Sequence, residues 1–200
     1  MSWSGERGAD GESGLWRLPE VVIVDDFLPN PDEMRALALN QTYAKMGSAG
    51  KRSAETFRHL VDPHMFEMLL HRKLSKPWDH YPINGRFQFC TAEDPLVYHA
   101  DEQSHAGVVF LTPNAPVESG LSLVRSRVTG ARESTKDTNS GATYGGNLLD
   151  STKWETVDKI GNIYNRLVLW NGRLNHAPSC YFGTELPNAR LFWMFFFDAV

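Results

Sequence analysis

The chain has 200 residues, of which 42% are hydrophobic and 22% are charged, and its formal net charge is −4. These values are typical of one soluble globular domain with a sizeable core. The acidic balance and the absence of a basic stripe argue against a nucleic-acid partner, and the longest apolar run, LFWMFFF, is too short to span a bilayer.

The first 17 residues differ in composition from the rest. They are polar, rich in Gly and Ser, and without the apolar stretch of a signal peptide, so we expect a flexible N-terminal arm and a cytoplasmic protein. In that setting Cys90 and Cys180 are expected to be free thiols. Residues 18–200 are then expected to form one domain.

Two helices are predicted in the first third of the chain. The first begins at Asn30-Pro31, with Asn30 as the N-cap and Glu33 completing a capping box. The second begins in the same way at Asp62-Pro63. A short buried strand, VVIV, precedes the first helix.

From residue 86 onward the pattern changes to short segments rich in β-branched and aromatic residues. They are separated by turn signals, among them Asn171-Gly172, which is typical of a hairpin. This density of short strands predicts a mostly β fold, a jelly roll (double-stranded β-helix, cupin-like), with the N-terminal helices packed on one sheet. The segments are RFQFCT, AGVVFLT, GLSLVRS, NRLVLW and NARLFWMFFFD.

Residues 129–164 interrupt this pattern. The segment is polar and Gly-rich at first and then weakly helical around Trp154, Val157 and Ile160. Long insertions in compact domains are usually functional or disordered. We expect a lid-like insertion that covers the substrate.

A candidate metal site lies in the β-rich part. His99 and Asp101 are two positions apart, so on an extended segment their side chains point to the same side. His176 follows the Asn171-Gly172 turn and is expected on the returning strand. Two imidazoles and one carboxylate form the facial triad of non-haem iron(II), which leaves three adjacent coordination positions open.

An arginine and several polar residues complete the candidate site. Arg190 opens the last predicted strand, and its guanidinium can hold a carboxylate with two parallel hydrogen bonds. A dicarboxylate co-substrate would supply that anion. Gln88, Tyr98 and Tyr81 are further candidates for hydrogen bonds to it, although packing in the core is an equal alternative for them.

The remaining polar candidates have simpler interpretations. An ordinary salt bridge is the default for Arg58, Arg125 and Arg166. His105 is expected to cap the start of its strand. Surface positions are expected for the other histidines, which are His59, His64, His71 and His80.

From about residue 20 to 198 the chain resembles the iron(II)/2-oxoglutarate-dependent oxygenases, in particular their small prolyl-4-hydroxylase-like branch. The resemblance rests on VVIVDDFLPNPDEMRALAL, YHAD, VVFLTPNAPVESGLSLVRS, NRLVLWNGRLNHA and ARLFWMFFFD. It implies oxidative decarboxylation of 2-oxoglutarate to succinate, coupled to hydroxylation of a C–H bond by O2. It also implies that His99, Asp101 and His176 are the iron ligands and that Arg190 binds the far carboxylate of 2-oxoglutarate. The loop CYFGTELPN lengthens the spacing from His176 to Arg190, which leaves Arg166 as a rival anchor.

The sequence leaves other functions open. One is a cupin-like metalloenzyme or metal-binding jelly-roll protein that uses no 2-oxoglutarate, and another is a non-catalytic binding protein. Halogenation is disfavoured, because halogenases of this type lack the carboxylate that Asp101 supplies. An amino-acid or peptide side chain, or a natural-product intermediate, is the expected substrate of a monomer or homodimer.

Overall fold

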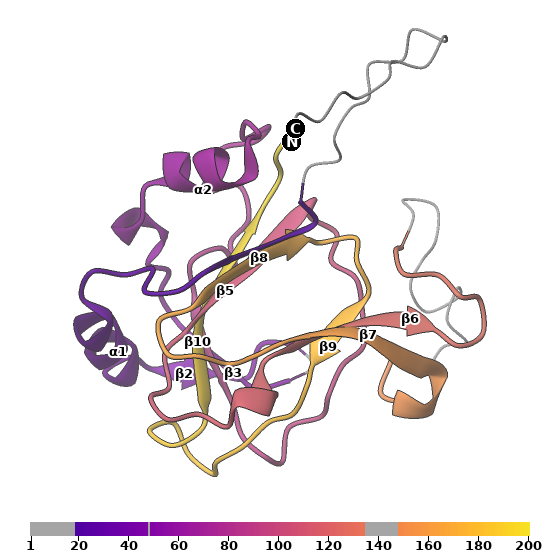
Figure 1. Ribbon diagram of the computed structural model, residues 1–200. Coiled ribbons are helices and arrows are strands. Elements are labelled where there is room, and N and C mark those ends of the chain that lie inside the picture. Colours follow the sequence, from indigo (N-terminus) through magenta and orange to yellow (C-terminus); the bar gives the residue numbers. More distant parts are fainter. Residues whose placement is uncertain (1–18, 48, 135–147) are drawn as a thin grey trace, which may run out of the picture.

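The computed structural model describes residues 19–47, 49–134 and 148–200, which fold around two antiparallel β-sheets (Figure 1). The α-helices are α1 (Pro31–Leu39) and α2 (Pro63–Leu70), and the 3-10 turns are Arg58–Leu60, Val117–Ser119 and Ser151–Lys153. The strands are β1 (Val21–Val24), β2 (Tyr43–Ala44), β3 (Lys51–Ser53), β4 (Phe87–Cys90), β5 (His105–Phe110), β6 (Leu121–Ser126), β7 (Trp154–Ile160), β8 (Leu167–Asn171), β9 (His176–Pro178) and β10 (Arg190–Phe197).

The larger sheet has the strand order β1-β8-β5-β10-β4-β3-β2. Strand β10 lies in its middle and is buried along almost its whole length. Because successive side chains point to opposite faces, Trp193 and Phe195 belong to one apolar core and Phe192 and Met194 to another. The prediction that this segment is buried on both faces is confirmed.

Both α-helices lie on one side of the larger sheet, as Figure 1 shows. Phe66 and Leu70 of α2 are buried, and the ring of Phe66 packs against Phe195 with the ring centroids 5.0 Å apart. Ala38 of α1 joins the same core. The two helices therefore close the outer face of the sheet, which leaves the opposite face free to form the interior of the barrel.

The two helices begin differently, although both start with an Asx-Pro pair. Asp62 has extended backbone angles, and its side chain accepts a hydrogen bond from the His64 amide at 2.9 Å. Asn30 occupies the N-cap of α1 with ψ 68°, and its side chain makes no capping hydrogen bond. The capping box predicted for Asn30 and Glu33 is therefore wrong, because this backbone turn points the amide away from the helix.

We expect Asp62→Ala to lower the free energy of unfolding by about 1 kcal/mol, because an orphan amide of α2 loses its acceptor. The matched control is Asn30→Ala, which removes a cap residue without a cap hydrogen bond and should change stability by much less. Urea unfolding of both variants measures the difference. Equal losses in the two variants would show that the hydrogen bond to His64 does not stabilise α2.

The smaller sheet has the order β7-β6-β9 and faces the side of the larger sheet that carries no helices (Figure 1). Leu121 and Leu123 of β6 pack with Val108, Phe192 and Met194 of the larger sheet. This interior core between two antiparallel sheets confirms the predicted jelly roll. The site described below lies at its edge.

Three local predictions are corrected. Residues 154–160 are not helical but form β7, which pairs with β6. The Asn171-Gly172 turn does not form a hairpin, because β8 belongs to the larger sheet and β9 to the smaller one. Strand β1 is only partly buried, with Ile23 46% exposed, because it is the edge strand of the larger sheet.

Some expectations fall on residues that are not described. The N-terminal arm (1–17) lies outside the described residues, and so do residues 135–147 of the expected lid. Cys90 and Cys180 are free thiols, as predicted. None of the helices in residues 19–47, 49–134 and 148–200 is long and apolar enough to cross a membrane.

Candidate functional site

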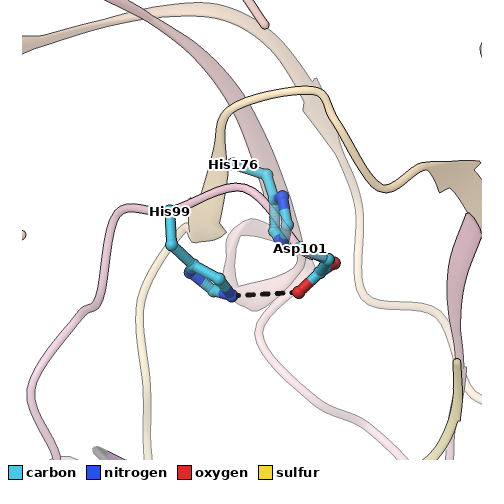
Figure 2. A group of neighbouring side chains, drawn as sticks. All are labelled: His99, Asp101 and His176. Atoms are coloured by element: carbon cyan, nitrogen blue, oxygen red, sulfur yellow. Dashed lines mark ion pairs between the residues drawn. The ribbon is translucent and has the colours of Figure 1, made fainter. Parts of the chain in front are cut away.

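The structure brings His99, Asp101 and His176 together (Figure 2). His99 and His176 form an isolated antiparallel bridge, in which the His99 amide donates to the His176 carbonyl at 3.0 Å and the reverse bond measures 2.8 Å. One ligand-type atom from each of the three side chains lies within 4.8 Å of the others. The prediction that the three side chains point to one place is confirmed.

A glycine allows the segment that carries Asp101 to approach β9. The Asp101 amide donates to the Gly172 carbonyl at 2.7 Å, and the Gly172 amide donates to the Ser104 carbonyl at 2.9 Å. A Cβ on Gly172 would lie 2.3 Å from the Gln103 carbonyl oxygen and 3.3 Å from the Asp101 Cβ. The turn between the two sheets therefore fixes the carboxylate as well as leading to His176.

Hydrogen bonds at the outer nitrogens orient both imidazoles. His99 Nδ1 lies 3.1 Å from the Val97 carbonyl oxygen, and His176 Nδ1 lies 2.8 Å from the Leu174 carbonyl oxygen. Because a carbonyl can only accept, each Nδ1 carries a proton. Each Nε2 therefore points inward, which is how backbone carbonyls commonly orient metal-binding histidines.

The inward-facing atoms suit a cation better than they suit one another. His99 Nε2 lies 3.4 Å from Asp101 Oδ1, and His176 Nε2 lies 3.5 Å from Asp101 Oδ2. Asp101 Oδ2 is buried and has no hydrogen-bond partner among the described residues. A carboxylate oxygen in that position is costly unless it meets a positive charge. Two nitrogen ligands and one oxygen ligand are the donor set of non-haem iron(II).

The pKa values agree with a site that holds charge. Burial lowers the pKa of His176 to about 4, so this imidazole stays neutral and able to ligate. Burial opposes the ionisation of Asp101, but the neighbouring His176 and His99 outweigh it and lower the pKa of the carboxyl. For His99, the hydrogen bond and charge of Asp101 outweigh burial and raise the pKa. A metal ion would displace the proton of His99.

The three side chains line a cavity of about 360 Å³. This volume lies in the range of small-molecule sites, and most of the wall is apolar. The lining residues are Gly47, Ala49, Arg52, Gln88, Val97, His99, Asp101, Val108, Leu121, Leu148, Trp170, His176, Pro178, Tyr181, Arg190, Phe192, Met194 and Phe196.

Arg190, the predicted anion ligand, lines this cavity from the first position of β10. It is 3% exposed, and its Nε and Nη2 donate to the carbonyls of Ser119 and Gly120 at 2.8 and 3.2 Å. Its guanidinium also lies over the ring of Phe192, 4.6 Å from the centroid. The group is therefore fixed in place, and its Nη1 has no hydrogen-bond partner among the described residues.

A second cavity-lining arginine, Arg52, was not predicted. Its Nε donates to Gln88 Oε1 at 2.9 Å, while Gln88 Nε2 donates to the Ala49 carbonyl at 3.1 Å. Gln88 thus lies in the cavity wall as expected, but both ends of its amide are occupied. The only sequence signal for Arg52 was its position between Gly50 and the predicted strand at 86–91, which is too weak to single out one arginine.

Other candidates do not reach the cavity. The ring of Tyr98 stacks on Trp154, with the centroids 5.7 Å apart, and does not line the wall. Arg166 forms a two-pronged ion pair with Asp25, at 2.6 and 2.9 Å, and likewise lies outside the cavity lining. Tyr81 donates to Asp198 at 2.5 Å, at a place that is also remote from the lining.

The remaining basic residues follow their simpler interpretations. Arg125 pairs with Glu155 on the surface, and Arg58 does not line the cavity. His105 is the first residue of β5 and is buried, and burial lowers its pKa to about 4. The exposed histidines are His59, His64, His71 and His80, as predicted.

Comparison with known proteins gives matches in structure only. No protein-family model matches the sequence, and a search of curated proteins gave no significant match. The structure is similar to HygX from Streptomyces hygroscopicus with nickel, 2-oxoglutarate and hygromycin B bound. The identity is 12%, the TM-score is 0.55, and the match covers 88% of this chain and 81% of HygX.

A second similar structure is a prolyl hydroxylase from Trichoplax adhaerens in complex with a peptide fragment of the hypoxia-inducible factor oxygen degradation domain. Here the identity is 10%, the TM-score is 0.51, and the match covers 90% of this chain and 84% of that chain. At such identities the likeness concerns the fold. The fold of this chain is that of the iron(II)/2-oxoglutarate-dependent oxygenases, the family that its sequence resembles.

Proposed function

We propose that the chain is an iron(II)/2-oxoglutarate-dependent dioxygenase that hydroxylates an unactivated C–H bond. Its substrate would be an amino-acid or peptide side chain or a natural-product intermediate, with 2-oxoglutarate converted to succinate. The observation that carries the proposal is the pairing of two features in one cavity. Three inward-pointing ligand atoms converge at His99, Asp101 and His176, and the guanidinium of Arg190 lines the same wall.

The residues divide the work as follows. His99, Asp101 and His176 would hold iron(II), which supplies the activation of O2 when bound. Arg190 would pair with the far carboxylate of 2-oxoglutarate, because its Nη1 has no other partner among the described residues and the low polarity around it strengthens the pair. The apolar side chains of Leu121, Trp170 and others exclude water from the reacting carbon.

The similar structures support the co-substrate and the substrate classes. HygX holds 2-oxoglutarate with nickel, and another structure of HygX holds iron. The ligand hygromycin B and the peptide on the prolyl hydroxylase represent the two substrate classes proposed here. A cupin-like metalloenzyme without 2-oxoglutarate would be favoured by an Arg190 that faces solvent, whereas Arg190 is buried.

Anaerobic reconstitution with iron(II) and 2-oxoglutarate tests the proposal. We expect a weak visible charge-transfer band that appears only when both are present, and succinate release after exposure to air. Iron binding without the band would favour the cupin-like alternative. Failure to bind iron would favour a non-catalytic jelly-roll binding protein.

A further inference from the structure

The cavity holds one positive charge more than the proposed chemistry uses. Its wall carries two guanidinium groups, Arg52 and Arg190, and one carboxylate, Asp101. Tyr181 also lines the wall, but burial raises its pKa well above the ordinary value and it stays neutral. If iron(II) and 2-oxoglutarate bind as proposed, the ion and Arg190 balance Asp101 and the two carboxylates of the co-substrate. The charge of Arg52 is then left without a counter-charge.

Arg52 is held so that one edge of its guanidinium stays open. Strand β3 pairs with β4 in a register that sets Arg52 opposite Gln88, and the Nε–Oε1 hydrogen bond uses the inner edge of the group. The Nη1 and Nη2 atoms have no hydrogen-bond or ion-pair partner in the described part of the chain. Two parallel N–H groups on that outer edge match the two oxygens of a carboxylate.

The backbone around Arg52 is shaped to admit the guanidinium. Gly47 has φ +99°, and a Cβ there would lie 3.4 Å from Arg52 Nη2 and 3.5 Å from Nη1. Gly50 has φ +66°, and a Cβ there would lie 2.4 Å from the Phe89 carbonyl oxygen. The chain therefore passes close over the guanidinium and against β4, at two positions where glycine is strongly favoured.

The two arginines differ in depth, which separates their roles. Arg190 is 3% exposed and is tied to two backbone carbonyls, whereas Arg52 is only half-buried and lies beside Gly47 and Ala49. A co-substrate that binds first needs the deeper position, and the substrate that enters after it meets the outer one. We propose that Arg52 is the substrate-binding residue of this cavity and that the substrate carries a carboxylate on an apolar body. This inference rests on the proposed function.

The test uses a fluorinated carboxylate as probe. The full chain is loaded with zinc(II), which is diamagnetic, and 2-oxoglutarate, and 4-fluorophenylacetate is titrated in while its fluorine NMR signal is followed. The neutral comparison is 4-fluorophenylacetamide. We expect the acid to bind at least about tenfold more tightly than the amide, because only the acid pairs with Arg52. Arg52→Gln should remove that preference.

Two variants and one spectrum make the outcomes distinct. Arg125→Gln, which removes a surface arginine paired with Glu155, is the matched control and should keep the preference. Arg52→Lys, which keeps the charge and loses the two-pronged contact, should bind the acid with intermediate affinity and serves if Arg52→Gln does not fold. The charge-transfer band with iron(II) and 2-oxoglutarate is recorded for every variant.

Three results would overturn the inference. One is that acid and amide bind wild type equally, or that neither binds. Another is that Arg52→Gln keeps the preference for the acid. The third is that Arg52→Gln loses the charge-transfer band, which would make Arg52 a ligand of 2-oxoglutarate instead. By contrast, absence of the band in wild type would contradict the proposed function itself.

Discussion

Asp101→Ala is expected to lower iron(II) affinity at least about a hundredfold and to abolish hydroxylation. Loss of an outer-sphere partner already costs about 10- to 100-fold, and Asp101 supplies the only carboxylate of the three-residue set. Stability should respond differently. Because Asp101 Oδ2 is buried without a hydrogen-bond donor among the described residues, the metal-free variant should melt no lower than metal-free wild type.

Thermal melts with and without iron(II), together with iron content, measure both effects. Iron should raise the melting temperature of wild type by binding only the folded state, and should leave that of Asp101→Ala unchanged. The matched control is Glu102→Ala, which removes an exposed neighbouring carboxylate and should behave as wild type. Full hydroxylation by Asp101→Ala would mean that His99 and Asp101 are an ordinary polar pair at the edge of the barrel.

Arg190→Lys is expected to weaken 2-oxoglutarate binding about tenfold or more while iron(II) affinity is largely kept. Lysine keeps the positive charge but loses the planar fork and the contact with the ring of Phe192. It also cannot satisfy the carbonyls of Ser119 and Gly120 with the same geometry. Titration of 2-oxoglutarate under the charge-transfer band, at saturating iron, gives the affinity directly.

The corresponding control is Arg166→Lys. Arg166 is paired with Asp25 outside the cavity lining, so this variant should bind 2-oxoglutarate as wild type does. The opposite pattern, with weakened binding in Arg166→Lys alone, would transfer the anchor to Arg166 and leave Arg190 a structural residue.

The order of strands and the three converging side chains could be predicted from the sequence because short-range rules govern them. Alternation and β-branched content mark strands such as β5 and β10, and the i, i+2 spacing of His99 and Asp101 determines their common direction. The position of Arg190 at the start of β10 follows from the same strand boundary. None of these inferences needs knowledge of which strands are neighbours.

The misassigned parts depend on tertiary context. Trp154, Val157 and Ile160 are spaced like one face of a helix, yet they lie on β7, where only Trp154 and Ile160 are buried and the residues between are largely exposed. An edge strand of a small sheet shows little alternation, so spacing alone misleads. Arg52 was missed for a related reason, because its role depends on the pairing of β3 with β4 and on the passage of Gly47 over it.

The bridge between His99 and His176 also bears on the order of events in folding. The backbone hydrogen bonds that join this bridge, and those between Asp101, Ser104 and Gly172, connect segments far apart in the sequence. Closing such a loop costs chain entropy before any contact offsets it, so these bonds are expected to form late. A partly folded chain then has no complete set of ligands to offer. Metal binding should therefore slow the unfolding of the finished barrel and leave its rate of folding nearly unchanged.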